Sequence, residues 1–198
     1  MNISQQKKLI RSQYRQLRMQ LSPIEVQQRS TLIAQNVITN ILKKISILNN
    51  LKIACYVSAF NEVRCDEIIN FLLANKIITA LPKINETTQD LDFIEYNPTI
   101  QLQKNKQFTN ILEPNSTLKI IPDIIIMPLV AFDKNCRRLG MGAGYYDKTL
   151  ANLQRQNSKI KTIGLGYDFQ EFKPSLTVEK HDLSLDFIVS EKTIFLPN

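Results

Sequence analysis

The sequence predicts a three-layer α/β protein, in which a mostly parallel sheet lies between two layers of helices and an N-terminal helical segment precedes it. Two patterns carry this prediction. Between residues 51 and 189, short apolar runs typical of buried strands alternate with stretches of helical periodicity. The most apolar run, residues 123–130, is rich in β-branched residues, as is typical of a strand covered on both faces. Strands that are connected through helices pair in parallel, so most of the sheet should be parallel.

Residues 1–45 are predicted to form two helices that pack on this core. Within residues 4–20, apolar side chains recur at helical spacing along one face: Ile10, Tyr14, Leu17 and Leu21. Ser22 and Glu25 have the spacing of a capping box, and Pro23 suits the first helical position. A second helix should therefore begin there and run to about Lys44.

A second stripe on the first predicted helix is basic. Its members are Lys7, Arg11, Arg15 and Arg18. Like charges stacked along one helix face repel one another. The stripe therefore indicates either a solvated face or a helix that lies beside an anion, and the sequence alone favours neither.

The other elements follow in chain order. Strands are expected at 51–58, 77–81, 92–96, 123–130, 161–166 and 186–189, and helices at 62–75 and from about 145 to 156. Pro82 should end the second strand, and residues 97–110 should form a polar surface excursion. Ligands of such sheets gather at the carboxyl ends of the strands, which is where a glycine-rich segment follows residues 123–130.

Length and composition fit one globular domain spanning residues 1–198, with 43% hydrophobic and 22% charged residues. Three cysteines without a C-x-x-C pattern indicate a reducing compartment. We find neither a signal-peptide pattern nor an apolar run of membrane-spanning length, so a cytoplasmic protein without a membrane partner is expected. The net charge of +7 suits either a nucleic-acid binder or an enzyme that acts on polyanionic small molecules.

The glycines mark the candidate site. All five lie between Gly140 and Gly166, and three of them alternate with other residues in 138–147, Arg-Leu-Gly-Met-Gly-Ala-Gly-Tyr-Tyr-Asp. Glycines at this spacing let successive backbone N–H groups converge on an anion, and the helix predicted to follow adds the positive end of its dipole. Neither the P-loop nor the dinucleotide-binding pattern is present. The segment predicts a phosphate cradle of another kind, although similar runs also form plain tight turns.

Few other residues are candidates for chemistry. Asp147, one turn into the helix, could hold Mg²⁺ on a bound phosphate. The lone His181 is more typical of a structural histidine, and its neighbour Asp182 is a second candidate metal ligand. Glu62 could either hydrogen-bond a polar ligand at the edge of the sheet or stabilise the start of a helix. No serine or cysteine nucleophile with a credible partner is found.

With these residues in place, the chain resembles the 5-formyltetrahydrofolate cyclo-ligases, also called methenyltetrahydrofolate synthetases. Seven pieces occur in family order from end to end. They are Lys7-x-x-x-Arg11, Phe60-Asn61-Glu62-Val63, Leu81-Pro82-Lys83, Pro128-x-x-Ala131-Phe132-Asp133, the segment 138–147, Gly164-Leu165-Gly166-Tyr167-Asp168-Phe169-Gln170, and Glu179-x-His181-Asp182.

The resemblance implies a fold shared with sugar-phosphate isomerases and CoA transferases. It also implies an ATP- and Mg²⁺-dependent closure of 5-formyltetrahydrofolate to 5,10-methenyltetrahydrofolate through a phosphorylated formyl group, carried out by a monomer with no nucleic-acid partner. The implied ATP-binding residues are Lys7, Lys8, Arg11, Arg138, Leu139, Gly140, Met141, Gly142, Ala143, Gly144, Tyr145 and Tyr146. The implied folate-binding residues are Val57, Glu62, Met141, Gly142, Ala143, Gly144 and Tyr145. The implied metal ligands are Asp147 and Asp182.

Three positions depart from the family pattern. Cys136 replaces a usual glycine, Ala143 a usual glycine or lysine, and Tyr167 a usual phenylalanine. If residue 136 needs a positive φ, a side chain there costs about 1 kcal/mol. None of the three removes an implied ligand.

Two other function classes remain open from the residues. A basic RNA-binding protein would use the basic stripe, but we find no interleaved aromatic and basic motif. A sugar-phosphate isomerase or acyl-CoA enzyme of the same fold would turn over without ATP and would leave Asp147 and Asp182 without a role.

Overall fold

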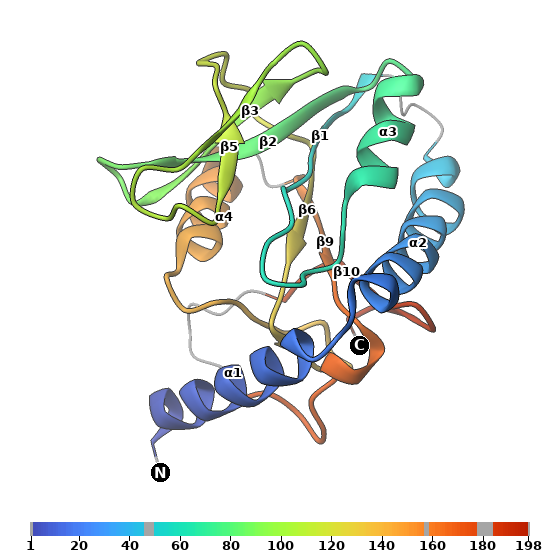
Figure 1. The fold of residues 1–198 in the computed structure, drawn as a ribbon, viewed down its shortest axis with the longest axis vertical. Coiled ribbons are helices and arrows are strands. Elements are labelled where there is room, and N and C mark those ends of the chain that lie inside the picture. The colour runs from blue at the N-terminus through green and yellow to red at the C-terminus, as the bar shows by residue number, and fades with distance from the viewer. Residues whose placement is uncertain (1, 46–49, 157–158, 178–183, 198) are drawn as a thin grey trace.

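The computed structural model describes residues 2–45, 50–156, 159–177 and 184–197. Its main sheet has seven strands (Figure 1). In sheet order they are β11 (Ile194–Phe195), β10 (Phe187–Val189), β9 (Lys161–Leu165), β6 (Ile124–Pro128), β1 (Lys52–Ala54), β2 (Ile78–Asn85) and β3 (Asp90–Tyr96). The five inner strands pair in parallel, and the two edge strands, β3 and β11, are antiparallel to their neighbours.

Helices cover both faces of the sheet, which confirms the three-layer α/β prediction. Alternate residues of β6 face opposite ways: Ile124 and Ile126 join one core cluster, and Ile125 and Met127 join another. Helices α2 (Pro23–Asn40) and α3 (Asp66–Ala74) pack into the first cluster, and α4 (Tyr145–Gln156) packs into the second through Leu150. Burial on both faces explains why residues 123–130 are apolar throughout.

The N-terminal helix α1 (Ile3–Met19) lies across the carboxyl ends of the strands in Figure 1. Tyr14 packs in a third cluster with Val130, Leu139 and Leu176. Ile10 borders this cluster, whereas Leu17 is 39% exposed, so the predicted apolar stripe is only partly buried. The predicted capping box of α2 is present, with the Ser22 and Glu25 side chains each accepting the other's backbone N–H.

Several boundaries differ from the sequence prediction. The helix predicted from Glu62 begins at Asp66, so Glu62 lies in the loop before it. The second helix ends at Asn40, and a 3₁₀ turn, η1 (Leu42–Lys44), follows it. The strand predicted over 51–58 is regular only over Lys52–Ala54.

Pro82 does not end β2, which continues to Asn85. Beyond Ala80, which pairs with the last residue of β1, β2 forms ladder pairs with β3 alone among the described strands. Proline has no backbone N–H to donate, but at position 82 no residue of β1 lies opposite to accept one. Pro82 is therefore tolerated within β2.

The excursion predicted over 97–110 contains regular structure. Its strand β4 (Leu102–Lys104) pairs antiparallel with β5 (Leu112–Pro114). A second small ribbon, β7 (Ala131–Phe132) with β8 (Arg138–Leu139), leads into the glycine-rich segment. A 3₁₀ turn, η3 (Asp168–Gln170), follows β9.

Candidate active site

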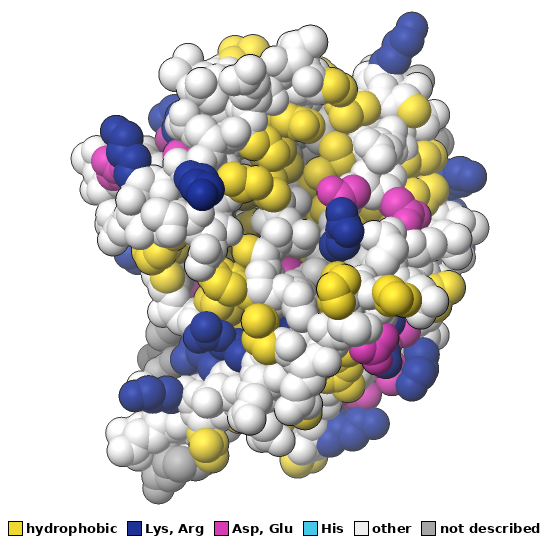
Figure 2. Space-filling view, in the orientation of Figure 1, with side chains coloured by type: hydrophobic (Ala, Val, Ile, Leu, Met, Phe, Trp, Pro, Cys, Tyr) yellow, Lys and Arg dark blue, Asp and Glu magenta, His cyan; other side chains and the backbone are white. Residues whose placement is uncertain are grey.

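The strand order reverses between β1 and β6, because the chain continues from β1 to β2 on one side and returns to β6 on the other. Loops that leave the carboxyl ends of such neighbouring strands diverge and leave a crevice. A pocket of about 820 Å³ lies there, within the usual size range for small-molecule sites. It is bordered by the loops after β1 and β6, the glycine-rich segment, β2 and β3, the β4–β5 hairpin and α1. Figure 2 shows a hollow on this face, with hydrophobic side chains around it and Lys and Arg side chains beside α1.

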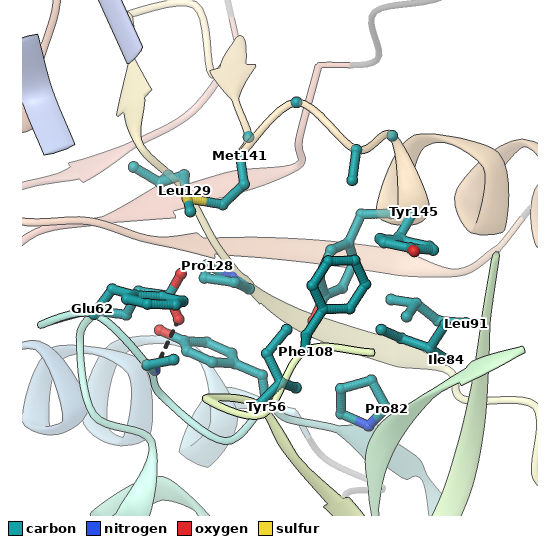
Figure 3. A pocket seen from close by; sticks show the side chains of 18 of the residues that line it. Tyr56, Glu62, Pro82, Ile84, Leu91, Phe108, Pro128, Leu129, Met141 and Tyr145 are labelled. Carbon is teal, nitrogen blue, oxygen red and sulfur yellow. Dashed lines mark hydrogen bonds between the residues drawn. The ribbon is translucent and has the colours of Figure 1, made fainter. Parts of the chain in front are cut away.

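Glu62 enters the pocket from the loop after β1 (Figure 3). Its residue is 8% exposed, one carboxylate oxygen accepts the Ala59 N–H at 3.1 Å, and the other lies 3.8 Å from Nη2 of Arg18. Burial raises the pKa of Glu62, and the Arg18 charge and the Ala59 hydrogen bond oppose that rise. The carboxyl group is therefore a buried acceptor that can pair with donors of a ligand. Its alternative role, at the start of α3, is excluded by the position of Asp66.

The glycine-rich segment forms a loop that requires two of its glycines. Gly142 and Gly144 have φ values of 106° and 75°, which side-chain-bearing residues rarely adopt. The Gly140 carbonyl accepts a hydrogen bond from Nε of Arg11 at 2.9 Å, so the loop is tied to α1. The loop ends at Tyr145, where α4 begins, and the positive end of the α4 dipole therefore lies at the pocket.

Arg138 and Asp147 lie on either side of this loop and form an ion pair, with Arg138 Nη2 and Asp147 Oδ1 2.6 Å apart. The Arg138 side chain is almost fully buried and its guanidinium carbon lies 5.6 Å from the centre of the Tyr146 ring, whereas the Asp147 side chain is 40% exposed. A methyl group at Gly140 would lie 2.8 Å from Arg138 Nη1, so this glycine makes room for the guanidinium. Asp147 thus presents a partly exposed carboxylate at the edge of the pocket.

The wall opposite Glu62 was not predicted from the sequence. Pro82, Ile84, Leu91 and Phe108 line it, and the Phe108 ring meets Tyr145 edge-on at 6.3 Å between ring centres (Figure 3). Phe108 lies in the connection between β4 and β5, within a stretch whose polar composition indicated only a surface loop. The signal that could have identified it is an aromatic residue isolated among Gln, Lys and Asn.

The residues implied by the family resemblance divide into three groups. Those that line the pocket are Lys7, Arg11, Val57, Glu62, Arg138, Gly140, Met141, Gly142, Ala143, Gly144, Tyr145, Tyr146 and Asp147. Lys8 is exposed on α1 and does not line it, and Leu139 is buried in the core cluster around Tyr14. Asp182 and His181 lie outside the described residues. Within the part of the chain that is described, no group of three or more His, Cys, Asp or Glu side chains could hold a metal ion.

The basic stripe is only partly solvated. Lys7 and Arg11 line the pocket, Arg18 is 1% exposed, and Arg15 is exposed to solvent. Only the first two members of the stripe therefore border the pocket, whereas Arg15 faces solvent and Arg18 lies inside the core. Among the described helices, none has both the length and the apolar character that a membrane crossing requires.

Comparison with known proteins decides the family. The sequence profile of the 5-formyltetrahydrofolate cyclo-ligase family matches residues 3–191. The chain belongs to this family. A 5-formyltetrahydrofolate cyclo-ligase from Mycoplasma pneumoniae is 35% identical over 94% of this chain and 99% of its own. One from Haemophilus influenzae is 32% identical over 92% of this chain and 96% of its own.

Solved structures of family members have the same fold. A 5,10-methenyltetrahydrofolate synthetase from Mycoplasma pneumoniae superposes with a TM-score of 0.70 at 31% identity, covering 93% of this chain and 98% of the other. The synthetase from Aquifex aeolicus superposes with a TM-score of 0.77 at 26% identity, covering 96% of this chain and 92% of the other. The cyclo-ligase resemblance drawn from scattered motifs is therefore confirmed.

Proposed function

We propose that this protein converts 5-formyltetrahydrofolate to 5,10-methenyltetrahydrofolate with consumption of ATP in the presence of Mg²⁺, through a phosphorylated formyl oxygen and with release of ADP and phosphate. Family membership supports the cyclo-ligase activity. The observation that carries the ATP-dependent mechanism is that the loop of residues 140–144 lies against Arg11 and Arg138 and lines the same pocket as the apolar wall around Phe108. We call these two parts the basic end and the apolar end of the pocket. A phosphoryl donor and a folate bound at the two ends would meet at this loop.

At the basic end, we assign the phosphates of ATP to the glycine loop and the start of α4, with Lys7, Arg11 and Arg138 as neutralising cations. Tyr145 and Tyr146 continue this surface into the helix. Leu139 supports the loop from the core and offers no side chain to a ligand, and Lys8 contributes positive charge from the exposed face of α1.

Asp147 fits the role of a Mg²⁺ ligand. Mg²⁺ in phosphoryl-transfer sites is held by one or two carboxylates, phosphate oxygens and water, so a single partly exposed carboxylate beside a phosphate cradle is sufficient. The bound ion would neutralise charge on the transferring phosphoryl group. We assign Asp182 as a second ligand on the family resemblance alone.

At the other end, Glu62 and Val57 are assigned to the folate. The pterin ring of a folate carries an amide N–H and an amino group side by side, a donor pair that a carboxylate can accept from with both oxygens. The aromatic and aliphatic wall formed by Phe108, Leu91 and Ile84 would pack against the rest of the ring system.

The reaction requires alignment more than a protein nucleophile. The formyl oxygen attacks the γ-phosphorus of ATP and ADP leaves. The neighbouring N10 then attacks the activated carbon, a C–N bond forms, the C–O bond to phosphate breaks, and N10 loses its proton. The protein would align the two substrates and neutralise charge, so the lack of a predicted nucleophilic Ser or Cys is no objection to this reaction.

The test is near-ultraviolet absorbance of the methenyl product in mixtures of protein, 5-formyltetrahydrofolate, Mg²⁺ and ATP. We expect the chromophore to appear only with ATP, and to be lost with Asp147→Asn but retained with the surface control Asp66→Asn. Asp66 forms an exposed ion pair with Arg64 away from the pocket. Folded protein that binds ATP without forming the chromophore would contradict the proposal. RNA binding without any such turnover would instead favour the RNA-binding alternative.

A further inference from the structure

One buried charge at the folate end has no assigned role. The guanidinium of Arg18, near the end of α1, is enclosed by three segments that border the pocket. Nε donates to the Phe60 carbonyl at 2.9 Å, Nη1 donates to the Leu129 carbonyl at 3.1 Å, and Nη2 lies 3.8 Å from the Glu62 carboxylate. Nη2 also lies 4.0 Å from Sδ of Met141 in the glycine loop. Arg18 therefore joins the loops after β1 and β6 and reaches the glycine loop.

The loop that it holds is strained at the two residues before Glu62. Phe60 and Asn61 have φ values of 51° and 57°, and consecutive left-handed residues with side chains persist only where their surroundings hold them. Besides the bond from Arg18 to Phe60, the Asn61 side chain donates to the Leu21 carbonyl at 2.9 Å, and the Tyr167 hydroxyl donates to the Asn61 carbonyl at 3.1 Å. These contacts fix the direction in which the next residue, Glu62, points.

Arg18 also acts on the charge of Glu62. Burial favours the neutral acid and raises the pKa of this carboxyl, and Arg18 is the cation that opposes the rise. Among the described residues, the hydroxyls of Tyr56, after β1, and of Tyr146, in α4, also interact electrostatically with Glu62, and burial raises the pKa of each. Neither offers a positive charge to the carboxylate.

We propose that Arg18 is a positioning residue for substrate recognition, which holds the Phe60–Asn61 turn in place and keeps the Glu62 carboxylate charged and aimed at the donors of the pterin ring. This inference rests on the proposed function. It gives α1 two roles, because the first half of the helix contributes Lys7 and Arg11 to the proposed nucleotide end and its last turn orders the folate end.

The experiment compares Arg18→Met with Arg15→Met in steady-state formation of the methenyl product. Methionine fills part of the same volume without charge or donors, and Arg15 is an exposed arginine of the same helix that does not line the pocket. For Arg18→Met we expect KM for 5-formyltetrahydrofolate to rise about tenfold or more, with a much smaller change in KM for ATP. The acidic limb of the kcat/KM profile for the folate should move to higher pH, because Glu62 loses the cation that favours its ionised form. Arg15→Met should match the wild type.

A double-mutant cycle with Glu62→Gln separates positioning from a general loss of stability. If Arg18 acts through Glu62, Arg18→Met should change kcat/KM little once residue 62 is glutamine. An equally large loss in both backgrounds, or an unshifted acidic limb, would overturn the proposal. An inactive wild type would instead refute the proposed function, so the two failures are distinguishable.

If Arg18→Met does not fold, Arg18→Lys replaces it. Lysine keeps the charge but presents one nitrogen where the guanidinium presents three. KM for the folate should then rise while the acidic limb stays in place. A wild-type KM in this variant would contradict the proposed role.

Discussion

Cys136 occupies a left-handed backbone conformation, with φ of 58°, and is fully buried in the turn that joins β7 to β8. The departure from the usual glycine therefore falls where a side chain is strained, at about 1–2 kcal/mol. We expect Cys136→Gly to unfold at higher urea concentration than Cys136→Ala, by about 1 kcal/mol in the free energy of unfolding. Both variants lose the thiol, so the comparison isolates the backbone. If alanine were the more stable of the two, buried contact of the Cβ atom would outweigh the strain.

Gly142 is the glycine whose replacement should separate function from stability. Its φ is 106°, and a methyl group there would also lie 3.4 Å from Nε of Arg11. We expect Gly142→Ala to distort the loop and raise KM for ATP about tenfold or more, with a modest loss of stability because the loop is exposed.

The matched variant is Gly164→Ala in β9, where the added methyl group would lie 2.7 Å from Leu185 in the core. It should lower the free energy of unfolding by about 1–3 kcal/mol and leave KM for ATP unchanged. Urea unfolding and initial rates on both variants check the pair. A normal KM for ATP in Gly142→Ala would contradict the proposed role of the loop in nucleotide binding.

Titration of Glu62 should make the stability of the protein depend on pH. Because burial raises its pKa in the folded state, its contribution to stability is fully present below the pKa of an unfolded glutamate, and is lost as pH rises through the raised value. The wild type should therefore lose stability relative to Glu62→Gln across that interval, by about 1.4 kcal/mol for each pH unit that separates the folded pKa from the unfolded one. Urea unfolding of both proteins between about pH 4 and pH 8 measures the difference. A difference that grew in the opposite direction would mean that Arg18 outweighs burial.

The β4–β5 hairpin carries Phe108 to the pocket, and a buried hydrogen bond between Asn105 and Glu113 supports the turn that holds this ring. The Asn105 side chain donates to the Glu113 carboxylate at 2.9 Å, and its carbonyl accepts the N–H groups of Gln107 and Phe108, both at 2.9 Å. These bonds hold the turn that presents Phe108 to the pocket. Without them the hairpin would keep its short ladder but lose the position of the aromatic ring.

We therefore expect Asn105→Ala to raise KM for 5-formyltetrahydrofolate about tenfold, because a buried carboxylate and two N–H groups lose their partner. Asn97→Ala is the control. Asn97 makes a similar turn bond, to the N–H of Thr99 at 3.0 Å, but is exposed and away from the pocket. Hydrogen exchange over residues 102–114 should increase in the first variant only. If KM rose equally in both, the excursion as a whole rather than this contact would govern binding.

At the scale of the whole molecule, the periodicity of apolar residues predicted the helix and sheet layers. The features that it did not predict depend on specific tertiary contacts. The run 123–130 was recognisable because both faces of β6 are buried. The end of β2 was predicted wrongly at Pro82, because a proline interrupts a strand only where a neighbouring strand needs its N–H group. The sequence does not show that β1 ends before that position. The helix predicted from Glu62 begins at Asp66 instead, because the contacts of Arg18 and Asn61 hold the preceding residues in a turn.

The site was predictable where glycine or family motifs carried it. Gly140, Gly142 and Gly144 were identified from spacing. Gly142 and Gly144 have positive φ, whereas Gly140 does not and instead makes room for Arg138. Phe108 was missed although it is an aromatic residue isolated in a polar stretch, because its position at the pocket depends on a buried Asn105–Glu113 contact that no sequence pattern indicates. Arg18 was recognised only as one of four basic residues, since nothing in the spacing shows which of them turns inward.

The net charge of +7 is a property of the whole chain, and it bears on the two ends of the pocket differently. Screening weakens attraction between exposed charges, as the Debye length falls from about 10 Å at 0.1 M salt to about 3 Å at 1 M. Binding of ATP at the proposed basic end should be sensitive to screening, whereas the proposed folate contacts are apolar apart from the buried Glu62. Raising NaCl from about 0.05 M to about 0.5 M should therefore increase KM for ATP several-fold and change KM for 5-formyltetrahydrofolate monoglutamate much less. Potassium glutamate at matched ionic strength controls for chloride competing at the phosphate cradle. Equal salt sensitivity of both KM values would mean that the two substrates share the basic end, and the separation of the pocket into two ends would have to be abandoned.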